Sequence, residues 1–332
     1  MLTDLCRKFF PNSIIEENTL GFPWTREDGW PLNLPDKKSC NFSDPNFWLI
    51  LNLQDMLTED QYGVKELRQI HNYYADFADM KRIIVIVWPL RIKNVWPVDS
   101  FNLVEFSTFQ YETWKQYKQH EDVLREIYAE RNKRFEYNFV CMNRHDKPHR
   151  RVAYTKLRQY GMAANCSLQS KGYELAYPNK SFKDYEHEYN NFTNLMSLQD
   201  NFNTALFNII SESQYQEMFG IVTEKTFNAF VAGMPFMVIG HRKFHQDVES
   251  LGFRNFNKVF ELEYDDVDNS KRLDKMIEDN SIFIKNHMHL DNMYDVFDYC
   301  KEDIEYNRDY FFADFGQQQE SKLQKKLLEL WS

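Results

Sequence analysis

The sequence predicts an α/β protein of two domains, each built on a parallel sheet. Short apolar runs of strand length alternate with charged or amphipathic segments of helix length along the chain, which is the pattern of strand–helix–strand units. The alternation restarts near residue 136, and a chain of 332 residues suits two domains of roughly 150 residues each. The composition, 43 % hydrophobic and 27 % charged, is that of a globular protein.

The N-terminal half begins with an arm, residues 1–45, that we expect to be rich in loops. Pro11, Pro23, Pro31 and Pro35 interrupt any regular period there. The elements predicted after the arm are a strand at 47–53 (FWLILNL), a helix at about 59–78, strands at 82–88 (RIIVIVW) and 102–106 (NLVEF), and a charged helical stretch at 110–134. The β-branched run at 82–88 is the clearest strand of the chain.

The C-terminal half repeats the alternation with stronger boundary signals. Its predicted strands are 137–142 (YNFVCM), 204–210 (TALFNII), 235–240 (PFMVIG) and 258–264 (KVFELEY). Its predicted helices are 148–161, with Pro148 near its start, and 223–233, which Gly233 ends. In the second of these, Phe227, Phe230 and Val231 form a core face. An amphipathic helix at 321–331 closes the chain.

Composition excludes several classes of protein. The net charge of −10 disfavours broad nucleic-acid binding, because phosphate contacts need clustered Lys and Arg. The N-terminus has no basic segment followed by an apolar run, so we expect no signal peptide. No apolar run reaches the roughly 18 residues of a membrane span. Five scattered cysteines without CxxC spacing predict free thiols and a cytoplasmic location.

Two predicted helices begin with cations, which a helix N-terminus normally disfavours. Lys225 lies in the first turn of the helix at 223–233, after Glu224 and the predicted cap Thr223. In the helix at 148–161, the first turn holds His149, Arg150 and Arg151. Arg144 and Lys147 precede that turn. Both starts follow strands, where open parallel sheets bind ligands. The pattern indicates a phosphate or pyrophosphate site; the alternative is solvated basic residues paired with acids such as Asp146 and Glu224.

Two carboxylates lie near the second cationic start. Glu212 follows the strand at 204–210, and Glu224 precedes Lys225. A carboxylate at the end of a strand can accept hydrogen bonds from the vicinal hydroxyls of a ribose or a hexose. Alternatively, Glu224 simply favours the helix N-terminus. Spacing alone leaves both interpretations open.

The stretch FNIISESQYQEMFGIVTEKTFNAFVAGMPFMVIG, with FVCMNRHDKPHRRVAYTKL upstream, resembles the donor-binding domain of GT-B glycosyltransferases. It is similar to the α1,3-fucosyltransferases and to related proteins of bacteriophages. The resemblance covers about residues 136–265 and implies two Rossmann-like domains with a cleft between them. It implies an acceptor-side domain at 1–135, a nucleotide-sugar domain at 136–312 and a closing helix at 313–332 that packs back on the first domain.

The resemblance also implies roles for particular residues. Glu224 would bind ribose hydroxyls, and Lys225 with Arg144 or Arg150 would bind the diphosphate of a UDP- or GDP-linked sugar, without a metal. The donor-binding set expected from the charges and the matching motifs is Arg144, His149, Arg150, Glu212, Thr223, Glu224 and Lys225. The first carboxylate stands in Ser-Glu-Ser instead of the Glu-Asn-Ser of the fucosyltransferases, so the identity of the donor does not carry over.

An inverting transferase also needs a carboxylate base near the acceptor hydroxyl. Asp55, after the first strand, and Glu105, at the end of the third, are the candidates for this catalytic role, with purely structural roles as the alternative. Asp266 and Asp268 form an Asp-x-Asp, which we interpret as a surface loop; His241 and His245 are interpreted as surface histidines, and no metal site is predicted.

The expected activity is therefore sugar transfer from a nucleoside-diphosphate donor to a hydroxyl acceptor. A glycan is the plainer acceptor, and a hydroxymethylated DNA base is the other, which the acidic net charge disfavours. A phage origin would place the protein in the host cytoplasm. The alternative function is a non-catalytic sugar- or nucleotide-binding protein, or a structural protein, that retains the GT-B fold.

Overall fold

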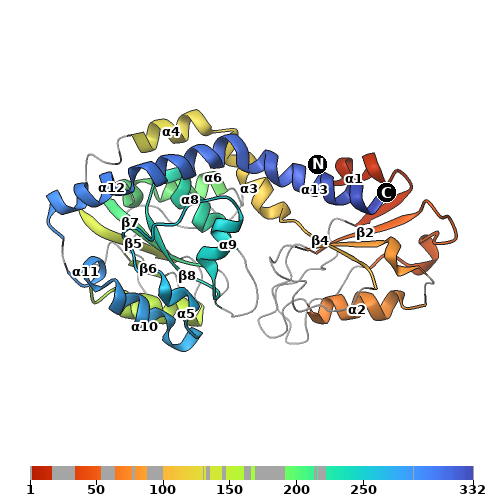
Figure 1. Ribbon diagram of the computed structural model, residues 1–332, viewed down its shortest axis with the longest axis horizontal. Coiled ribbons are helices and arrows are strands. Elements are labelled where there is room, and N and C mark those ends of the chain that lie inside the picture. The colour runs from red at the N-terminus through yellow and green to blue at the C-terminus, as the bar shows by residue number, and fades with distance from the viewer. Residues whose placement is uncertain are drawn as a thin grey trace. The chain divides into compact units, whose positions relative to one another are not determined.

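In the part of the chain that the structure describes, the protein is an α/β structure with two parallel sheets of four strands each, shown in Figure 1. The computed structural model describes residues 2–16, 34–53, 64–76, 79–87, 100–129, 131, 135–143, 147–160, 166–168, 191–212, 215, 222–286 and 288–331. The chain divides into two compact units: unit 1 comprises Met1–Tyr111 and the residues from Gln317 onward, and unit 2 comprises most of Glu112–Gly316.

Unit 1 holds the sheet β1-β2-β3-β4, in which all neighbours are parallel. Its elements are α1 (Leu2–Phe9), β1 (Ser13–Glu16), β2 (Trp48–Leu53), α2 (Val64–Tyr74), β3 (Ile83–Val87) and β4 (Asn102–Glu105), with short 3₁₀ turns at Lys37–Ser39 and Met80–Arg82. Every residue of β3 is buried, as expected for a parallel strand covered on both faces. Leu67, Ile70 and Tyr74 of α2 join the same core.

The N-terminal arm is more regular than we predicted from its prolines. Helix α1 comes first, and β1 then pairs with β2 from Ser13↔Trp48 to Glu16↔Leu51, so residues 2–16 supply the edge strand of the sheet. The proline argument missed this because Pro11 lies between the two elements and interrupts neither. Residues 17–33, with Pro23 and Pro31, lie outside the described part of the chain.

Unit 2 holds the sheet β6-β5-β7-β8, again parallel throughout. Its strands are β5 (Tyr137–Asn143), β6 (Cys166–Leu168), β7 (Ala205–Ser211) and β8 (Phe236–Ile239). Its helices are α4 (Glu121–Ala129), α5 (Pro148–Leu157), α6 (Asn191–Ser197), α7 (Gln199–Thr204), α8 (Glu224–Ala232), α9 (Phe244–Ser250), α10 (Asn269–Asp279), α11 (Ser281–Ile284) and α12 (Leu290–Tyr310), with most of α3 (Thr108–Lys118).

Residues 258–264 do not form the strand that we predicted. The backbone there makes a turn that leads into a 3₁₀ helix, Glu263–Asp266. The side chain of Asn280 binds both the N–H and the carbonyl of Glu261 at 2.9 Å, and the hydroxyl of buried Tyr264 accepts the N–H of Val238 in β8 at 3.0 Å. Side chains therefore take the backbone hydrogen bonds that a further strand would have made. The short strand β6 was not predicted.

The division between the units falls after Tyr111, whereas the sequence placed the domain boundary at 135/136. Helices α3 and α4 explain the difference, because they pack in unit 2: the hydroxyl of buried Tyr117 in α3 binds the backbone carbonyl of Asn191 at 3.1 Å and the side chain of Asn228 in α8.

The C-terminal helical segment continues from α12 through a π-helical turn, Phe311–Phe315, into α13 (Gly316–Trp331). From Gln317 onward it groups with unit 1. Within that unit Leu323 and Leu327 are buried, and the Trp331 ring lies 5.7 Å from the Phe10 ring.

Candidate functional site

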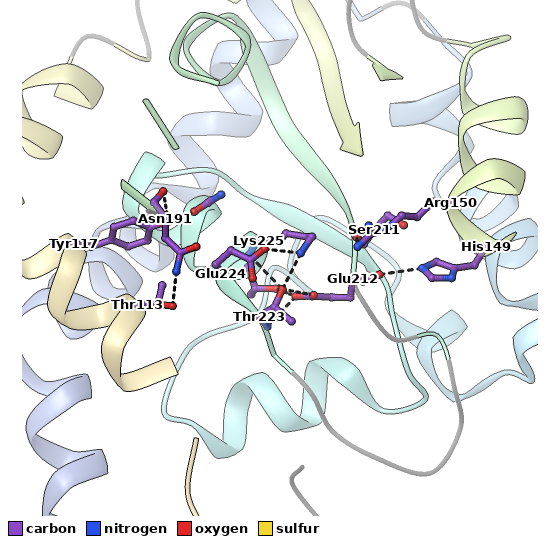
Figure 2. Close-up of polar contacts among 12 residues, drawn as sticks. Thr113, Tyr117, His149, Arg150, Asn191, Ser211, Glu212, Thr223, Glu224 and Lys225 are labelled. Atoms are coloured by element: carbon purple, nitrogen blue, oxygen red, sulfur yellow. Dashed lines mark hydrogen bonds and ion pairs between the residues drawn. The ribbon is translucent and has the colours of Figure 1, made fainter. Parts of the chain in front are cut away.

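The start of α8 is tied to the end of β7 by one carboxylate. All of β7 is buried, and Glu212, which follows it, is fully buried. One oxygen of Glu212 accepts the N–H of Thr223 at 3.1 Å and the hydroxyl of Thr226 at 2.7 Å, and the other accepts the hydroxyl of Thr223, as Figure 2 shows. The Glu212 carboxylate thus positions the helix start. The sequence named it as a donor-binding residue, able to accept hydrogen bonds from the hydroxyls of a ribose or a hexose.

Helix α8 has the boundaries that the sequence predicted. Thr223 is the N-cap, and its hydroxyl accepts the N–H of Lys225 at 3.4 Å. Gly233 ends the helix at φ 64°, in the left-handed region that glycine tolerates best. The predicted core face is confirmed, because Phe227, Phe230 and Val231 are all buried.

Lys225 and Glu224 form an ion pair at the start of α8. The ammonium nitrogen of Lys225 lies 2.6 Å from an oxygen of Glu224, and their side chains are 24 % and 16 % exposed. Burial raises the pKa of Glu224, but the charge of Lys225 and its hydrogen bond outweigh burial and hold that pKa below its ordinary value. The pair with Glu224 that we named as the alternative is therefore present, at a position that solvent still reaches.

Helix α5 begins at the end of the neighbouring strand, with Pro148 in its first turn. Nε2 of His149 donates a hydrogen bond to the backbone carbonyl of Glu212 at 2.9 Å, and its ring stacks on Tyr215 at 5.2 Å between centroids. Burial lowers the pKa of His149 to about 4, and the charges of Arg150, Lys147 and Lys225 act in the same direction. His149 is therefore neutral near pH 7 and links the two helix starts as a hydrogen-bond donor.

Arg150 lies at the same edge of the sheet but is almost fully buried, at 1 % exposure. Its Nη2 donates to the backbone carbonyl of Ser211, the last residue of β7, at 3.3 Å. In this position the guanidinium adds positive charge beneath the edge of the sheet, and its contact with the carbonyl end of β7 holds α5 in place.

Six of the predicted donor-binding residues thus gather where β5 and β7, neighbours in the sheet, reach their carboxyl ends. They are His149, Arg150, Glu212, Thr223, Glu224 and Lys225. Arg144 and the candidate base Asp55 lie outside the described residues. Glu105, the other candidate base, is exposed at the end of β4 in unit 1, where it pairs in register with Val87.

Sequence reasoning missed several polar residues of this region. Tyr215 stacks on His149, and Thr226 binds Glu212. Thr113 and Tyr117 of α3 and Asn191 of α6 form a polar cluster beside α8. Thr226 was detectable as a second threonine one turn after the cap; the other four carry no periodic signal, because only tertiary packing brings them to the site.

The histidines that we assigned to the surface are buried. Nε2 of His241 lies 2.7 Å from Asp247, and the His245 ring contacts Asn255 and Tyr264, each at 3.0 Å. Asp266 is exposed, 3.8 Å from Arg242, but it ends the 3₁₀ helix and Asp268 is the N-cap of α10. The predicted surface position is confirmed, and the predicted loop is not. Among the described residues there is no group of three or more His, Cys, Asp or Glu side chains with a metal-binding arrangement.

Comparisons with protein-family models, with curated proteins and with solved structures find no match. Within the described part of the chain, no helix combines the length and the apolar character that crossing a membrane requires. The five cysteines are free and buried.

Proposed function

We propose that the protein is a glycosyltransferase of GT-B type that moves a sugar from a UDP- or GDP-linked donor to a hydroxyl acceptor. The observation that carries the proposal is the pair of helix starts, α5 and α8, on adjacent strands at one edge of the sheet. They are joined by the hydrogen bond from His149 to Glu212, 2.9 Å long, with Lys225 partly exposed between polar neighbours. The positive end of a helix dipole and a cation at such an edge favour a diphosphate.

The chemistry follows from the charges. In the transfer, the bond between the sugar's anomeric carbon and the β-phosphate oxygen breaks, and the acceptor oxygen takes the sugar while losing its proton to a base. Negative charge develops on the diphosphate as it leaves. Lys225, released from Glu224, and the positive end of the α8 dipole would stabilise that charge. Glu224, ionised because its pKa is lowered, would then accept ribose hydroxyls.

The acceptor side of the proposal rests on unit 1. Glu105 is exposed at the carboxyl end of β4, the edge at which parallel sheets bind ligands, and it is the candidate base together with Asp55. The acceptor in this proposal is a hydroxyl of a glycan or of a hydroxymethylated base.

A panel of UDP- and GDP-linked sugars tests the proposal. Incubated with the protein, at least one donor should release free nucleoside diphosphate slowly by transfer to water, and faster when an acceptor glycan is present. Release at the rate of a protein-free control from every donor, together with tight binding of one of them, would instead establish the non-catalytic binding protein. Absence of both binding and release would remove the proposal.

A further inference from the structure

A buried polar cluster joins α3, α6 and α8 on the opposite side of the α8 start from His149 (Figure 2). Nδ2 of Asn191 donates to the hydroxyl of Thr113 at 2.7 Å, and the backbone N–H of Asn191 donates to Gln116 at 3.1 Å. The hydroxyl of Tyr117 binds both the carbonyl of Asn191 and the side chain of Asn228. The backbone of Asn191 is therefore held by two hydrogen bonds and its side-chain amide by one.

The second amide atom of Asn191 is not used by these contacts. Oδ1 is buried and has no hydrogen-bond partner among the described residues, and the residue as a whole is 4 % exposed. A buried acceptor left unpaired costs free energy, and native proteins rarely leave one without a water or a ligand. This is a separate observation from the charges at the start of α8.

Hydrogen bonds of the Tyr117 hydroxyl link Asn191 to Asn228 of α8. Asn228, which contacts Tyr117, is one helical turn after Glu224, so Glu224 and Asn228 share a face of α8. In the view of Figure 2 the side chain of Asn191 is drawn between Thr113 and Glu224. The acceptor atoms of Asn191 and Glu224 thus lie toward α3 and α6. The cations Lys147 and Arg150 lie at the start of α5, where Lys147 precedes the helix and Arg150 lies in its first turn.

We propose that Oδ1 of Asn191 accepts a hydrogen bond from a hydroxyl of the bound nucleotide sugar and so fixes its direction across the start of α8. This inference rests on the proposed function. The diphosphate would lie toward α5 and Lys225, and a hydroxyl-bearing ring would lie toward α3 and α6. That ring is either the ribose or the transferred sugar, since both present vicinal hydroxyls, and Asn191 would be a specificity residue.

Calorimetric titrations with four probes separate the two rings. The probes are inorganic pyrophosphate, UDP, a 2′,3′-dideoxy analogue of UDP, and a UDP-sugar, with the guanosine series used in parallel. If the ribose is bound, Asn191→Ala should weaken UDP about 5- to 20-fold and leave the dideoxy analogue and pyrophosphate unchanged. If the transferred sugar is bound, only the UDP-sugar should weaken, by the same factor.

Two controls keep loss of binding distinct from loss of fold. Asn194→Ala removes another asparagine from the same helix, partly exposed and outside the cluster, and should bind every probe as the wild type does. Thr113→Val keeps the volume but removes the hydroxyl that holds the amide, and should give a smaller loss for the same probe. The dideoxy comparison on the wild-type protein needs no variant.

The inference is overturned if Asn191→Ala binds UDP and the UDP-sugar with wild-type affinity, or if it weakens pyrophosphate as much as the other probes. The proposed function fails by a different result, in which the wild-type protein itself binds neither a uridine nor a guanosine diphosphate.

Discussion

At the scale of single residues, the structure separates groups that hold the site from groups that face solvent. Glu212 is fully buried and accepts hydrogen bonds from Thr223 and Thr226, so its carboxylate holds the helix start. Glu224 and Lys225 are partly exposed and paired with each other. In the proposed site, a diphosphate would compete with Glu224 for the ammonium group of Lys225, because a diphosphate carries more charge than a carboxylate. The ion pair is therefore compatible with a ligand-free resting state.

Glu212→Gln tests the anchoring role. The amide keeps the volume but replaces charge-assisted acceptors with one neutral oxygen and an NH₂ group that faces other donors, so unfolding free energy should fall by about 2–3 kcal/mol. Denaturant titration measures this, with the exposed Glu105→Gln as the matched control, which should change stability little. A Glu212→Gln protein with wild-type stability and no nucleotide binding would make Glu212 a ligand contact instead.

His149 predicts a pH dependence of stability. Its pKa falls from 6.5 to about 4 in the folded protein, so between these values the unfolded chain binds more protons and stability rises with pH. As pH drops from 6.5 toward 4, the wild type should lose about 1–3 kcal/mol more than His149→Asn, which keeps a donor but does not titrate. If the unfolding free energies of the two proteins changed with pH by the same amount, the burial of a neutral His149 imidazole would be contradicted.

At the scale of elements, the sequence predicted those whose signals are local. Strand β3 carries an unbroken β-branched run, and α8 carries a capping threonine and a terminal glycine. The wrong or missed predictions share one cause: tertiary contacts determine the structure of those segments. Residues 258–264 have strand-like composition, yet Asn280 satisfies the backbone of Glu261, and β6 exists only through its pairing with β5. The cation-rich helix starts were visible in the sequence, but the burial of Arg150 was not.

The two helix starts predict that donor binding needs no divalent metal. In the proposed site, the positive end of the α8 dipole and the ammonium group of Lys225 would supply positive charge to the diphosphate. Titration of UDP or GDP into protein dialysed against EDTA should therefore give an affinity within about twofold of that in Mg²⁺ or Mn²⁺. Strict metal dependence, abolished by Asp266→Ala, would favour an Asp-x-Asp metal site of GT-A type.

At the scale of the whole molecule, each unit has its own parallel sheet and its own core. The sequence motifs of donor binding fall in unit 2, and the structure gathers six of those residues at one edge of its sheet. The sheet of unit 1 is parallel as well, and the candidate base Glu105 ends its strand β4. Under the proposed function, unit 2 would bind the donor and unit 1 would supply the base for the acceptor.

Thermal melting of wild-type and Lys225→Ala protein, with and without UDP and GDP, tests the central claim most directly. Removing the ammonium group deletes a charge-assisted contact worth about 1.5–3 kcal/mol, so nucleoside-diphosphate affinity should fall roughly 10- to 150-fold. The melting temperature without ligand should change little, because the pair with Glu224 is partly exposed and a cation at a helix N-terminus is unfavourable. A Lys225→Ala protein that melts lower yet is stabilised by both nucleotides as the wild type is would contradict the proposed site.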